Sequence, residues 1–384
     1  MEYTENMKEY KINEIENKRV LGRNISDSCG GNKPLALFWG ASGIEINVKS
    51  KEVWIQLSAS YDNHEPWVSV EVNGSPVSRF MVPAGDARWY CIARNLNPEK
   101  EYLITVLKDT QPMPGDIHHS LLVHKVGLSD DGSFSPLKER KLNIEFIGDS
   151  ITSGEGLAGG VDEGDWITQW FCASKTYAMQ LSRKLDANYS VLSQCGWGIC
   201  WGWDGNLGSN MPAHYNKICS VIGGDYQKEL GGEDEYVSDL KNDYVILNLG
   251  TNDNGAFFQK PWVDENGKEH VLKVDENNKA VEADGLKVTA GVKNFLVNIR
   301  KNNPKAKIIW TWGMIKLAAV PEYILKGINE YKAEAGDNNV FTLELDAMEE
   351  VEVLPEDKGS RGHPGPKTHR LAAEKILNLI KSLN

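Results

Sequence analysis

The chain is 384 residues long, which corresponds to about two domains that can each bury a core of their own. Apolar residues make up 41% and charged residues 25%, as is typical of a soluble globular protein, and no apolar run approaches the roughly 20 residues that cross a bilayer. The formal net charge of -12 disfavours binding to nucleic acids and to anionic membranes. These properties favour a neutral or cationic partner.

The N-terminal segment, residues 1–20, has neither the basic start nor the apolar core of an export signal, and so indicates a cytoplasmic protein. The six cysteines lack a compact framework, which favours reduced thiols. They are Cys29, Cys91, Cys172, Cys195, Cys200 and Cys219. Neither these thiols nor the adjacent His118 and His119, which would point to opposite faces of a strand, have the spacing of a metal site. We predict no metal and no cofactor; the sequence gives no indication of oligomeric state.

Short β-rich segments separated by turn residues occupy the first part of the chain, where helical periodicity is nearly absent. The dipeptide Asn73-Gly74 is a strong hairpin signal between two of them. Evenly spaced short strands of this kind predict a separate β-sandwich or jelly-roll domain over residues 1–138. The expected strands are 44–48, 52–59, 67–74, 89–93, 102–108 and 120–128.

The pattern changes after the charged stretch 137–141, where strands begin to alternate with helices. Such alternation is typical of a parallel sheet with crossover helices, so residues 139–384 are expected to form a three-layer α/β/α domain. The polar stretch 261–284 interrupts it and predicts an inserted surface loop or hairpin. The expected strands are 143–147, 190–195, 243–250, 306–314 and 339–345, and the expected helices are 174–187, capped by Ser174, 292–304, 322–336 and 366–383.

A turn suited to a nucleophile follows the first of these strands. Ligands collect at the carboxyl ends of parallel strands, and the glycine of Gly148-Asp149-Ser150 permits a tight turn that exposes the serine hydroxyl. Serine needs a base within hydrogen-bonding reach, and His363 lies in the loop between the last strand and the last helix. His369 lies further into that helix and is expected to pack or orient it. A GDS turn alone is more often structural, so the hypothesis depends on the other motifs.

Two further strand ends offer hydrogen-bond donors for the oxyanion that develops during ester hydrolysis. Residues 195–198 (CGWG) follow the second strand and offer backbone N–H groups, and residues 250–253 (GTND) follow the third and offer the side-chain amide of Asn252. Each preorganised donor contributes about 3 to 4 kcal/mol to the stabilisation of the transition state. The sequence therefore predicts an oxyanion hole at the edge that carries Ser150.

The segments GDSITSGEG, GWG and GTND and a late HP, in this order and at strand ends, resemble the four blocks of the SGNH (GDSL-like) hydrolase superfamily over residues 142–384. The resemblance implies that Ser150 is the nucleophile and first oxyanion donor and that His363 is the general base. It implies Asn252 as another donor, together with a glycine of the second block. Gly198 is our choice for that glycine, and Gly196 is its rival.

The chain is more closely similar to carbohydrate esterase family 2, through GRN near residue 22, FWGASGIEINV, IEFIGDSITSGEG and MPAHY. Members of that family join an N-terminal jelly roll to the hydrolase domain, and the resemblance implies removal of O-acetyl groups from plant polysaccharides such as xylan and mannan. Many SGNH enzymes have an acid three residues before the histidine, where this chain has Ser360. Glu356 and Asp357 lie nearby, but a backbone carbonyl can orient His363 instead, so a Ser-His dyad is the prediction.

The chain has twelve tryptophans, which supports a sugar-binding site. Aromatic side chains near the carboxyl edge of the sheet can stack on sugar rings. Trp197, Trp201 and Trp203 lie in or near the CGWG segment 195–198, which we call the glycine loop. Trp310 and Trp312 lie at the end of a predicted strand. Most tryptophans pack in cores, and of these five we choose Trp312 and Trp201 as substrate-binding residues.

The sequence and the resemblance together predict a carbohydrate O-acetylesterase that acts on imported acetylated oligosaccharides of the mannan or xylan type. One alternative is an SGNH esterase on other acyl esters, such as lipids or thioesters, which would favour longer acyl chains. The second alternative is a sugar-binding protein with a degenerate hydrolase fold. The presence of Ser150, Asn252 and His363 argues against degeneration.

Overall fold

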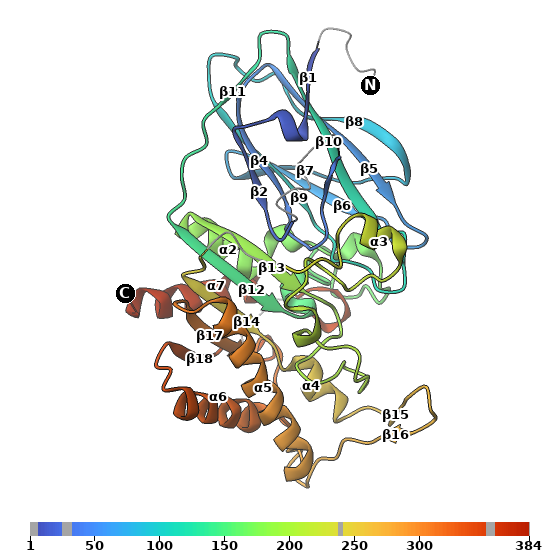
Figure 1. The fold of residues 1–384 in the computed structure, drawn as a ribbon, viewed down its shortest axis with the longest axis vertical. Coiled ribbons are helices and arrows are strands. Elements are labelled where there is room, and N and C mark those ends of the chain that lie inside the picture. The colour runs from blue at the N-terminus through green and yellow to red at the C-terminus, as the bar shows by residue number, and fades with distance from the viewer. Residues whose placement is uncertain (1–6, 25–32, 237–240, 351–357, 384) are drawn as a thin grey trace. The chain divides into compact units, whose positions relative to one another are not determined.

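The computed structural model describes residues 7–24, 33–236, 241–350 and 358–383 (Figure 1). The chain forms two compact units. Unit 1 consists of Met1–Arg140 together with Trp166–Ser174 and Asn216–Val237, and unit 2 consists of the rest. Within the described residues no helix is long and apolar enough to cross a membrane.

Unit 1 contains two antiparallel sheets. Strands β1-β10-β5-β8 form the first, with β3 paired to β10, and strands β11-β4-β9-β6-β7 form the second, with β2 paired to β4. Asn73 and Gly74 join β6 to β7, and both have positive φ, as the dipeptide predicts. The strands are β1 (Met7–Lys11), β2 (Lys18–Leu21), β3 (Leu35–Ala36), β4 (Gly43–Lys49), β5 (Glu52–Ser60), β6 (Trp67–Val72), β7 (Ser75–Met81), β8 (Gly85–Arg94), β9 (Tyr102–Lys108), β10 (Ser120–Ser129) and β11 (Ser133–Ser135).

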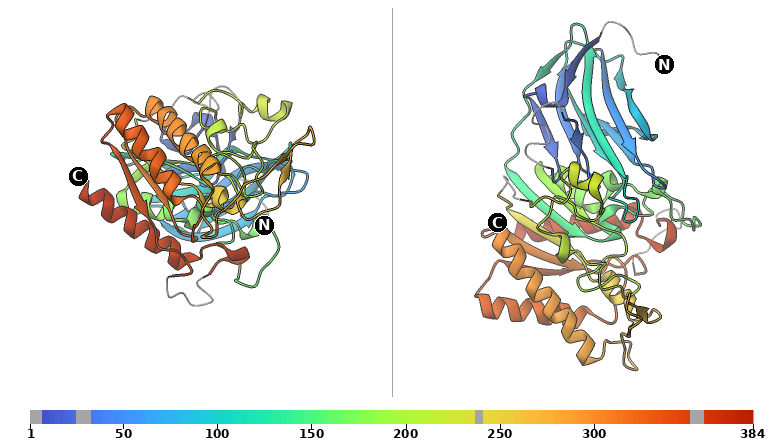
Figure 2. Two further views of the ribbon diagram at one scale, coloured as in Figure 1. Left: turned by 90° about the horizontal axis from the view of Figure 1, so that it is seen from below. Right: turned by 45° about the vertical axis from the view of Figure 1, so that its right-hand side comes forward.

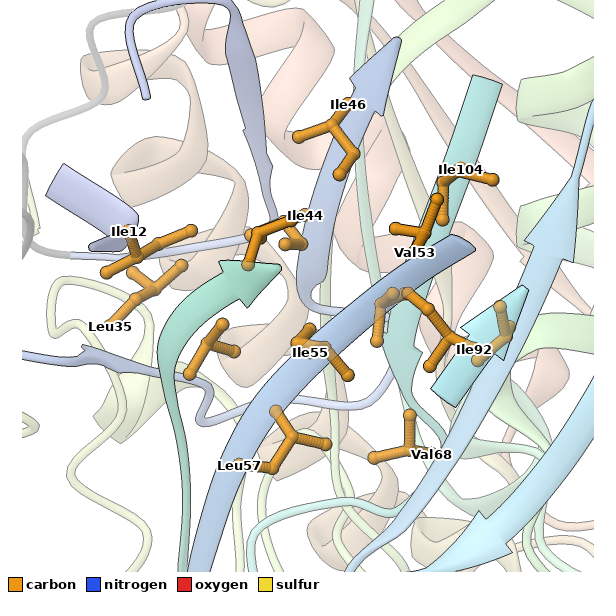
Figure 3. Packing of buried hydrophobic residues seen from close by; sticks show 14 of the residues in the cluster. Ile12, Leu35, Ile44, Ile46, Val53, Ile55, Leu57, Val68, Ile92 and Ile104 are labelled. Carbon is orange, nitrogen blue, oxygen red and sulfur yellow. The ribbon is translucent and has the colours of Figure 1, made fainter. Parts of the chain in front are cut away.

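One hydrophobic cluster includes residues of both sheets (Figure 3). Alternate residues of β4, such as Ile44 and Ile46, meet Ile55 and Leu57 of β5, and all four are buried. Side chains of a strand alternate between its faces, so each sheet contributes one apolar face to a shared core. Burial of each such side chain stabilises the fold by about 1.5 to 3 kcal/mol.

The segment Trp166–Ser174, which the sequence places in the second domain, clusters instead with unit 1. Its anchor is the fully buried carboxylate of Asp109, which accepts hydrogen bonds from the backbone N–H of Ser174 and from Nε of Arg79, each at 2.9 Å. Arg79 also donates to the carbonyl of Phe171 at 2.6 Å. Ser174 is therefore held by unit 1 and is not the helix cap that we expected.

The segment Asn216–Val237, with helix α3 (Asp225–Glu229), also clusters with unit 1. The indole Nε1 of Trp39 donates to the carbonyl of Ile218 at 2.7 Å, and Nη1 of Arg23 donates to the carbonyl of Lys217 at 2.8 Å. Unit 1 thus holds two stretches of chain that follow its own strands in the sequence.

Unit 2 is built on a five-stranded parallel sheet with the order β13-β12-β14-β17-β18. Helix α2 packs against α7 and helix α5 against α6, on the two faces of the sheet (Figure 1 and Figure 2). The predicted three-layer α/β fold is confirmed. The strands are β12 (Leu142–Gly148), β13 (Ala187–Ser193), β14 (Tyr244–Asn248), β17 (Lys307–Trp312) and β18 (Val340–Glu344), and the helices are α1 (Ser150–Ser153), α2 (Tyr177–Leu185), α4 (Thr251–Ala256), α5 (Glu282–Asn302), α6 (Pro321–Ala335) and α7 (Pro366–Ser382).

The polar insertion forms a short hairpin, β15 (Trp262–Val263) with β16 (Glu269–His270), as the sequence predicts. Its last residues belong to α5, which begins at Glu282 rather than at residue 292. The first turns of this helix are too polar to show an apolar stripe, so periodicity alone missed them.

Candidate active site

Three neighbouring strands bring the predicted motifs to one edge of the sheet in unit 2. Gly148 at the end of β12 is paired with Ser193 of β13 on one side and with Asn248 of β14 on the other. Because the strands are parallel, the loops after all three begin at the same edge. These loops carry Ser150, residues 195–198 and Asn252, respectively.

Ser150 is the first residue of α1, and its neighbours fix the turn. The carboxylate of Asp149 caps the helix by accepting from the N–H of Ile151 at 3.0 Å. A Cβ on Gly148 would lie 2.0 Å from Oγ1 of Thr152, so only glycine fits there. The turn therefore holds the hydroxyl-bearing residue at the strand end.

The structure brings Ser150 and His363 together, although 213 residues separate them. Nε2 of His363 lies 2.9 Å from Oγ of Ser150, within hydrogen-bond distance. Nδ1 of the same ring lies 3.2 Å from the carbonyl oxygen of Arg361. A carbonyl can only accept, so Nδ1 carries the proton and Nε2 is left to accept the serine hydroxyl.

Within the part of the chain that the structure describes, the group that faces Nδ1 is this carbonyl rather than an acidic side chain. Ser360 is fully buried, and its backbone N–H donates to the carbonyl of Gly156 at 2.9 Å. Glu356 and Asp357 lie outside the described residues. The expected dyad is compatible with this arrangement and stays a prediction.

The position of Gly198 disagrees with the donor role that we chose for it. Its N–H donates to the carbonyl of Ser209 at 3.3 Å, and a Cβ there would lie 2.4 Å from Oδ2 of Asp253. This glycine makes room for a buried carboxylate. The rival Gly196 has a φ of 75°, and no acceptor for its N–H is found in the described part of the chain. Gly196 is therefore the better candidate.

Asn252 and its neighbour in α4 hold the glycine loop. Nδ2 of Asn252 donates to the carbonyl of Trp197 at 2.8 Å, which uses one of its two amide hydrogens and leaves the other for a ligand. The carboxylate of Asp253 accepts from the N–H groups of Ile199 and Cys200, each at 2.8 Å. The sequence pointed to Asn252 but not to Asp253, because only a fold shows where a carboxylate points.

Two buried carboxyl groups, those of Asp149 and Asp253, lie next to the proposed site residues Ser150 and Asn252 in the chain. Burial, with a smaller contribution from the charge of Asp253, raises the pKa of Asp149 to about 7 against the opposing hydrogen bonds from Ile151 and Thr251. Burial also raises the pKa of Asp253 to about 6, against the opposing effect of its backbone donors. The loops are thus held by groups that change charge near neutral pH.

The two tryptophans that we chose as sugar platforms are buried. Trp201 is 3% exposed, donates to the carbonyl of Asp253 at 3.2 Å and packs edge-on against Phe257, and Trp312 is 4% exposed. Neither has an open face for a sugar ring, so this prediction is corrected. Trp203 is 53% exposed and lies against Gly196, where a Cβ would be 2.8 Å from its ring.

His369 is part of the packing, as expected. It is fully buried, its Nδ1 accepts from the N–H of Tyr177 at 3.0 Å, and the two rings stack. Burial lowers the pKa of His369 to about 3, so the ring stays neutral. Among the described residues, no group of three or more His, Cys, Asp and Glu side chains is arranged to hold a metal ion.

Comparison with known proteins decides the family. Residues 146–371 match the GDSL-like Lipase/Acylhydrolase family, over more than half of the chain. The chain belongs to this family. Its structural neighbours include family 2 carbohydrate esterases.

Among solved structures, an acetyl xylan esterase (Est2A) from the rumen bacterium Butyrivibrio proteoclasticus is 33% identical, with a TM-score of 0.91 over 98% of this chain and 99% of that one. A family two carbohydrate esterase from Clostridium thermocellum, in complex with cellohexaose, shares the fold at 21% identity, with a TM-score of 0.75 over 95% and 98% of the two chains.

Two curated relatives are more distant. The cellulase/esterase CelE of Acetivibrio thermocellus is 25% identical over 90% of this chain, and the chain spans 37% of its length. The acetylxylan esterase / glucomannan deacetylase of Cellvibrio japonicus is 26% identical over 77% of this chain and 69% of that protein.

Proposed function

We propose that this family member is a carbohydrate O-acetylesterase, with Ser150 as nucleophile and His363 as general base. The observation that carries the proposal is the 2.9 Å contact between Oγ of Ser150 and Nε2 of His363 at the carboxyl edge of the parallel sheet. The names of the relatives supply the acyl group, because Est2A and the Cellvibrio japonicus protein are both called acetyl xylan or acetylxylan esterases.

In the first step, Oγ of Ser150 attacks the acetyl carbonyl carbon while its proton passes to Nε2 of His363. A C–O bond forms, and the carbonyl π electrons move to the oxygen. The Arg361 carbonyl holds the Nδ1 proton and so keeps Nε2 free to act as base. Collapse of the tetrahedral intermediate breaks the ester bond, and Nε2–H gives its proton to the departing sugar oxygen.

In the second step, water attacks the acetyl-enzyme, and Nε2 of His363 takes a proton from that water. The acyl bond to Ser150 breaks, Oγ regains its proton from Nε2, and acetic acid leaves and loses its own proton to solvent as acetate. No redox partner or further reactant is needed, because each proton taken up by the imidazole is returned.

The oxyanion is stabilised by three donors in this proposal: the backbone N–H of Ser150, the second amide hydrogen of Asn252 and the backbone N–H of Gly196. Gly196 replaces Gly198 because the N–H of Gly198 already donates to Ser209. The bond from Asn252 to the carbonyl of Trp197 fixes the amide beside the glycine loop before substrate binds.

The substrate class is an acetylated oligosaccharide of the xylan or mannan type. The exposed indole of Trp203 against Gly196 supports it, because a sugar ring can stack on an exposed aromatic face beside the proposed oxyanion donor. Unit 1 would then be the N-terminal jelly roll of family 2 carbohydrate esterases, a topology with which its two antiparallel sheets are compatible.

Acetate release from acetylated xylo- and manno-oligosaccharides, measured for the wild type and for Ser150→Ala, tests the proposal. We expect release by the wild type and none above background by the variant. A series of p-nitrophenyl esters of increasing acyl length serves as the second arm. Activity that rises beyond propionyl would replace the acetylesterase with an esterase for longer acyl chains.

A further inference from the structure

A buried carboxylate lies beside the proposed base, on the side opposite to that of a triad acid. Glu155 is 5% exposed, and its Oε2 lies 3.6 Å from Nε2 of His363. This is the ring nitrogen that faces Oγ of Ser150, whereas a triad acid binds Nδ1. Glu155 therefore faces the nitrogen that receives the proton.

The local backbone brings Glu155 to this place. Its N–H donates to the carbonyl of Ser150 at 3.0 Å, which closes the turn after α1. Gly156 has a φ of 75°, and a Cβ there would lie 2.5 Å from the carbonyl oxygen of Ser360. A side chain at this position would therefore displace the loop that carries His363. The two loops are in contact because this residue is glycine.

Arg361 connects Glu155 to the other side of the imidazole. Its Nε lies 3.3 Å from Oε1 of Glu155, and its carbonyl oxygen faces Nδ1 of His363. Arg361 has a φ of 55°, a left-handed conformation that costs free energy for a residue with a Cβ. Two more bonds hold it there, from its N–H to the carbonyl of Glu163 at 3.2 Å and from Nη1 to the carbonyl of Gly164 at 3.0 Å.

We propose that Glu155 and Arg361 are positioning residues that together orient and stabilise His363. The Glu155 carboxylate stabilises the imidazolium that forms when Nε2 of His363 takes the serine proton, and its pairing with Arg361 holds the Arg361 carbonyl against Nδ1. The inference rests on the proposed function and deepens it.

The electrostatic part acts mainly on the transition state. When His363 acts as the base, Nε2 starts without a proton, so the carboxylate gains little from the ring; once Nε2 has taken the serine proton, a positive ring lies beside the buried carboxylate. Water screens such a pair weakly at a buried site. An interaction that strengthens as the transition state forms raises kcat rather than lowering KM.

Cys195 also contacts this carboxylate. Its thiol hydrogen-bonds Glu155, and burial raises the pKa of the thiol well above its usual value, so it stays an uncharged donor. The thiol is thus a neutral neighbour of the Glu155 carboxylate, and the guanidinium of Arg361 lies on the far oxygen of that carboxylate.

The test compares Glu155→Gln with Glu163→Gln by steady-state kinetics on p-nitrophenyl acetate. Glutamine keeps the size of Glu155 but removes its charge, so kcat should fall about 10-fold to 100-fold with little change in KM. Glu163 is an exposed residue of the same loop region, and its carbonyl rather than its carboxylate contacts Arg361, so Glu163→Gln should keep wild-type kcat.

Arg361→Gly tests the positioning part separately. Glycine accepts a φ of 55° without cost and keeps the carbonyl, but it removes the guanidinium. We expect kcat to fall about 10-fold and the Nδ1–H proton signal of His363 in NMR spectra to weaken or shift, because the carbonyl is no longer held. Glu155→Asp, which restores the charge, should recover part of the kcat lost in Glu155→Gln. If Glu155→Gln fails to fold, Arg361→Gly and Glu155→Asp still test whether Glu155 and Arg361 act on His363.

Wild-type kcat in Glu155→Gln, or in Arg361→Gly with an unchanged Nδ1–H signal, would overturn the inference. Ser150→Ala separates this failure from that of the proposed function. If Ser150→Ala is inactive while Glu155→Gln is fully active, only the inference is wrong. If Ser150→Ala turns over like the wild type, the proposed function itself is wrong.

Discussion

Two buried aspartates hold loops in this molecule, and they do so in different chemical settings. In unit 1, Asp109 holds the segment that ends at Ser174, and Arg79 balances its charge. In unit 2, Asp253 holds the glycine loop by accepting hydrogen bonds from two backbone N–H groups. A second buried acid, Asp149, is close enough for the charge of Asp253 to affect its pKa. The first setting is an ion pair that serves structure, and in the second setting burial disfavours the charged forms of two acids beside the proposed catalytic residues.

The comparison shows that, among the described residues, the protein tolerates buried acids without a basic partner beside the proposed active site, whereas Asp109 in unit 1 is paired with Arg79. Perturbed carboxyl groups cluster at functional sites, because the same desolvation that strengthens electrostatic catalysis also destabilises nearby charges. Substitutions at the two aspartates and at the residues around them can sharpen or break this contrast.

Asp109→Ala should have the largest effect on stability. It removes the partner of Arg79 and the acceptor for Ser174 in a fully buried place, so we expect the free energy of unfolding to fall by about 3 to 5 kcal/mol. Chemical denaturation of the variant measures this. Lys49→Ala, which disrupts only an exposed pair with Glu101, is the control and should cost less than about 1 kcal/mol. An equal loss in both variants would remove the structural role of Asp109.

Asn252→Ala should leave stability largely intact but lower kcat by about 100-fold to 1,000-fold, because it removes one oxyanion donor. Kinetics on p-nitrophenyl acetate measures the loss, and Asn254→Ala in the same helix is the comparison. The Oδ1 of Asn254 accepts from the N–H groups of Ala318 and Ala319, so its removal should reduce stability more than kcat. The reverse pattern would place the functional donor elsewhere.

Gly198→Ala separates a glycine needed for space from a glycine needed as a donor. An added Cβ would meet Oδ2 of Asp253 and the carbonyl of Trp201 at 2.4 Å each, so the free energy of unfolding should fall by about 1 to 3 kcal/mol. Gly160→Ala, whose Cβ would have its nearest neighbour at 3.9 Å, should be nearly neutral. A Gly198→Ala variant with wild-type stability would contradict the packing role given to this glycine.

The pH dependence of stability is the subtlest difference between the two regions. The pKa of Asp149 is raised to about 7 in the folded protein, so between its unfolded value of 3.8 and that pKa the folded state holds one proton more than the unfolded state. The free energy of unfolding should therefore fall as pH rises through this window, by about 1.4 kcal/mol per pH unit from this group.

Asp149→Asn should remove this contribution, while Asp162→Asn, on the surface of the same unit, should keep it. Chemical denaturation at several pH values between 4 and 7 provides the comparison. Identical slopes for the wild type and Asp149→Asn would mean that this carboxyl does not titrate as its burial suggests.

The elements and the contact between Ser150 and His363 could be predicted from the sequence because their signals are local. Parallel strands bring their carboxyl ends to one edge, so motifs at strand ends identify neighbours in space, and Ser150, Asn252 and His363 were found in this way. The choice between Gly196 and Gly198 could not be made from such local signals. It depended on where the carboxylate of Asp253 points, which spacing does not reveal.

Other features depended on contacts between residues far apart in the sequence. The burial of Trp201 and Trp312 follows from packing in unit 2, and the assignment of Trp166–Ser174 to unit 1 follows from its bonds to Asp109. Glu155 lies close to the nucleophile in the sequence, but its meeting with His363 depends on a loop at the other end of the domain.

Covalent labelling tests the central claim most directly. The wild type is incubated with an alkyl fluorophosphonate, which traps an activated serine, and is then digested and analysed by mass spectrometry while acetate release is followed in parallel. The account predicts one adduct per chain on Ser150, with loss of activity in proportion to labelling. Full inactivation with the adduct on another residue, or undiminished acetate release from a chain labelled at Ser150, would contradict it.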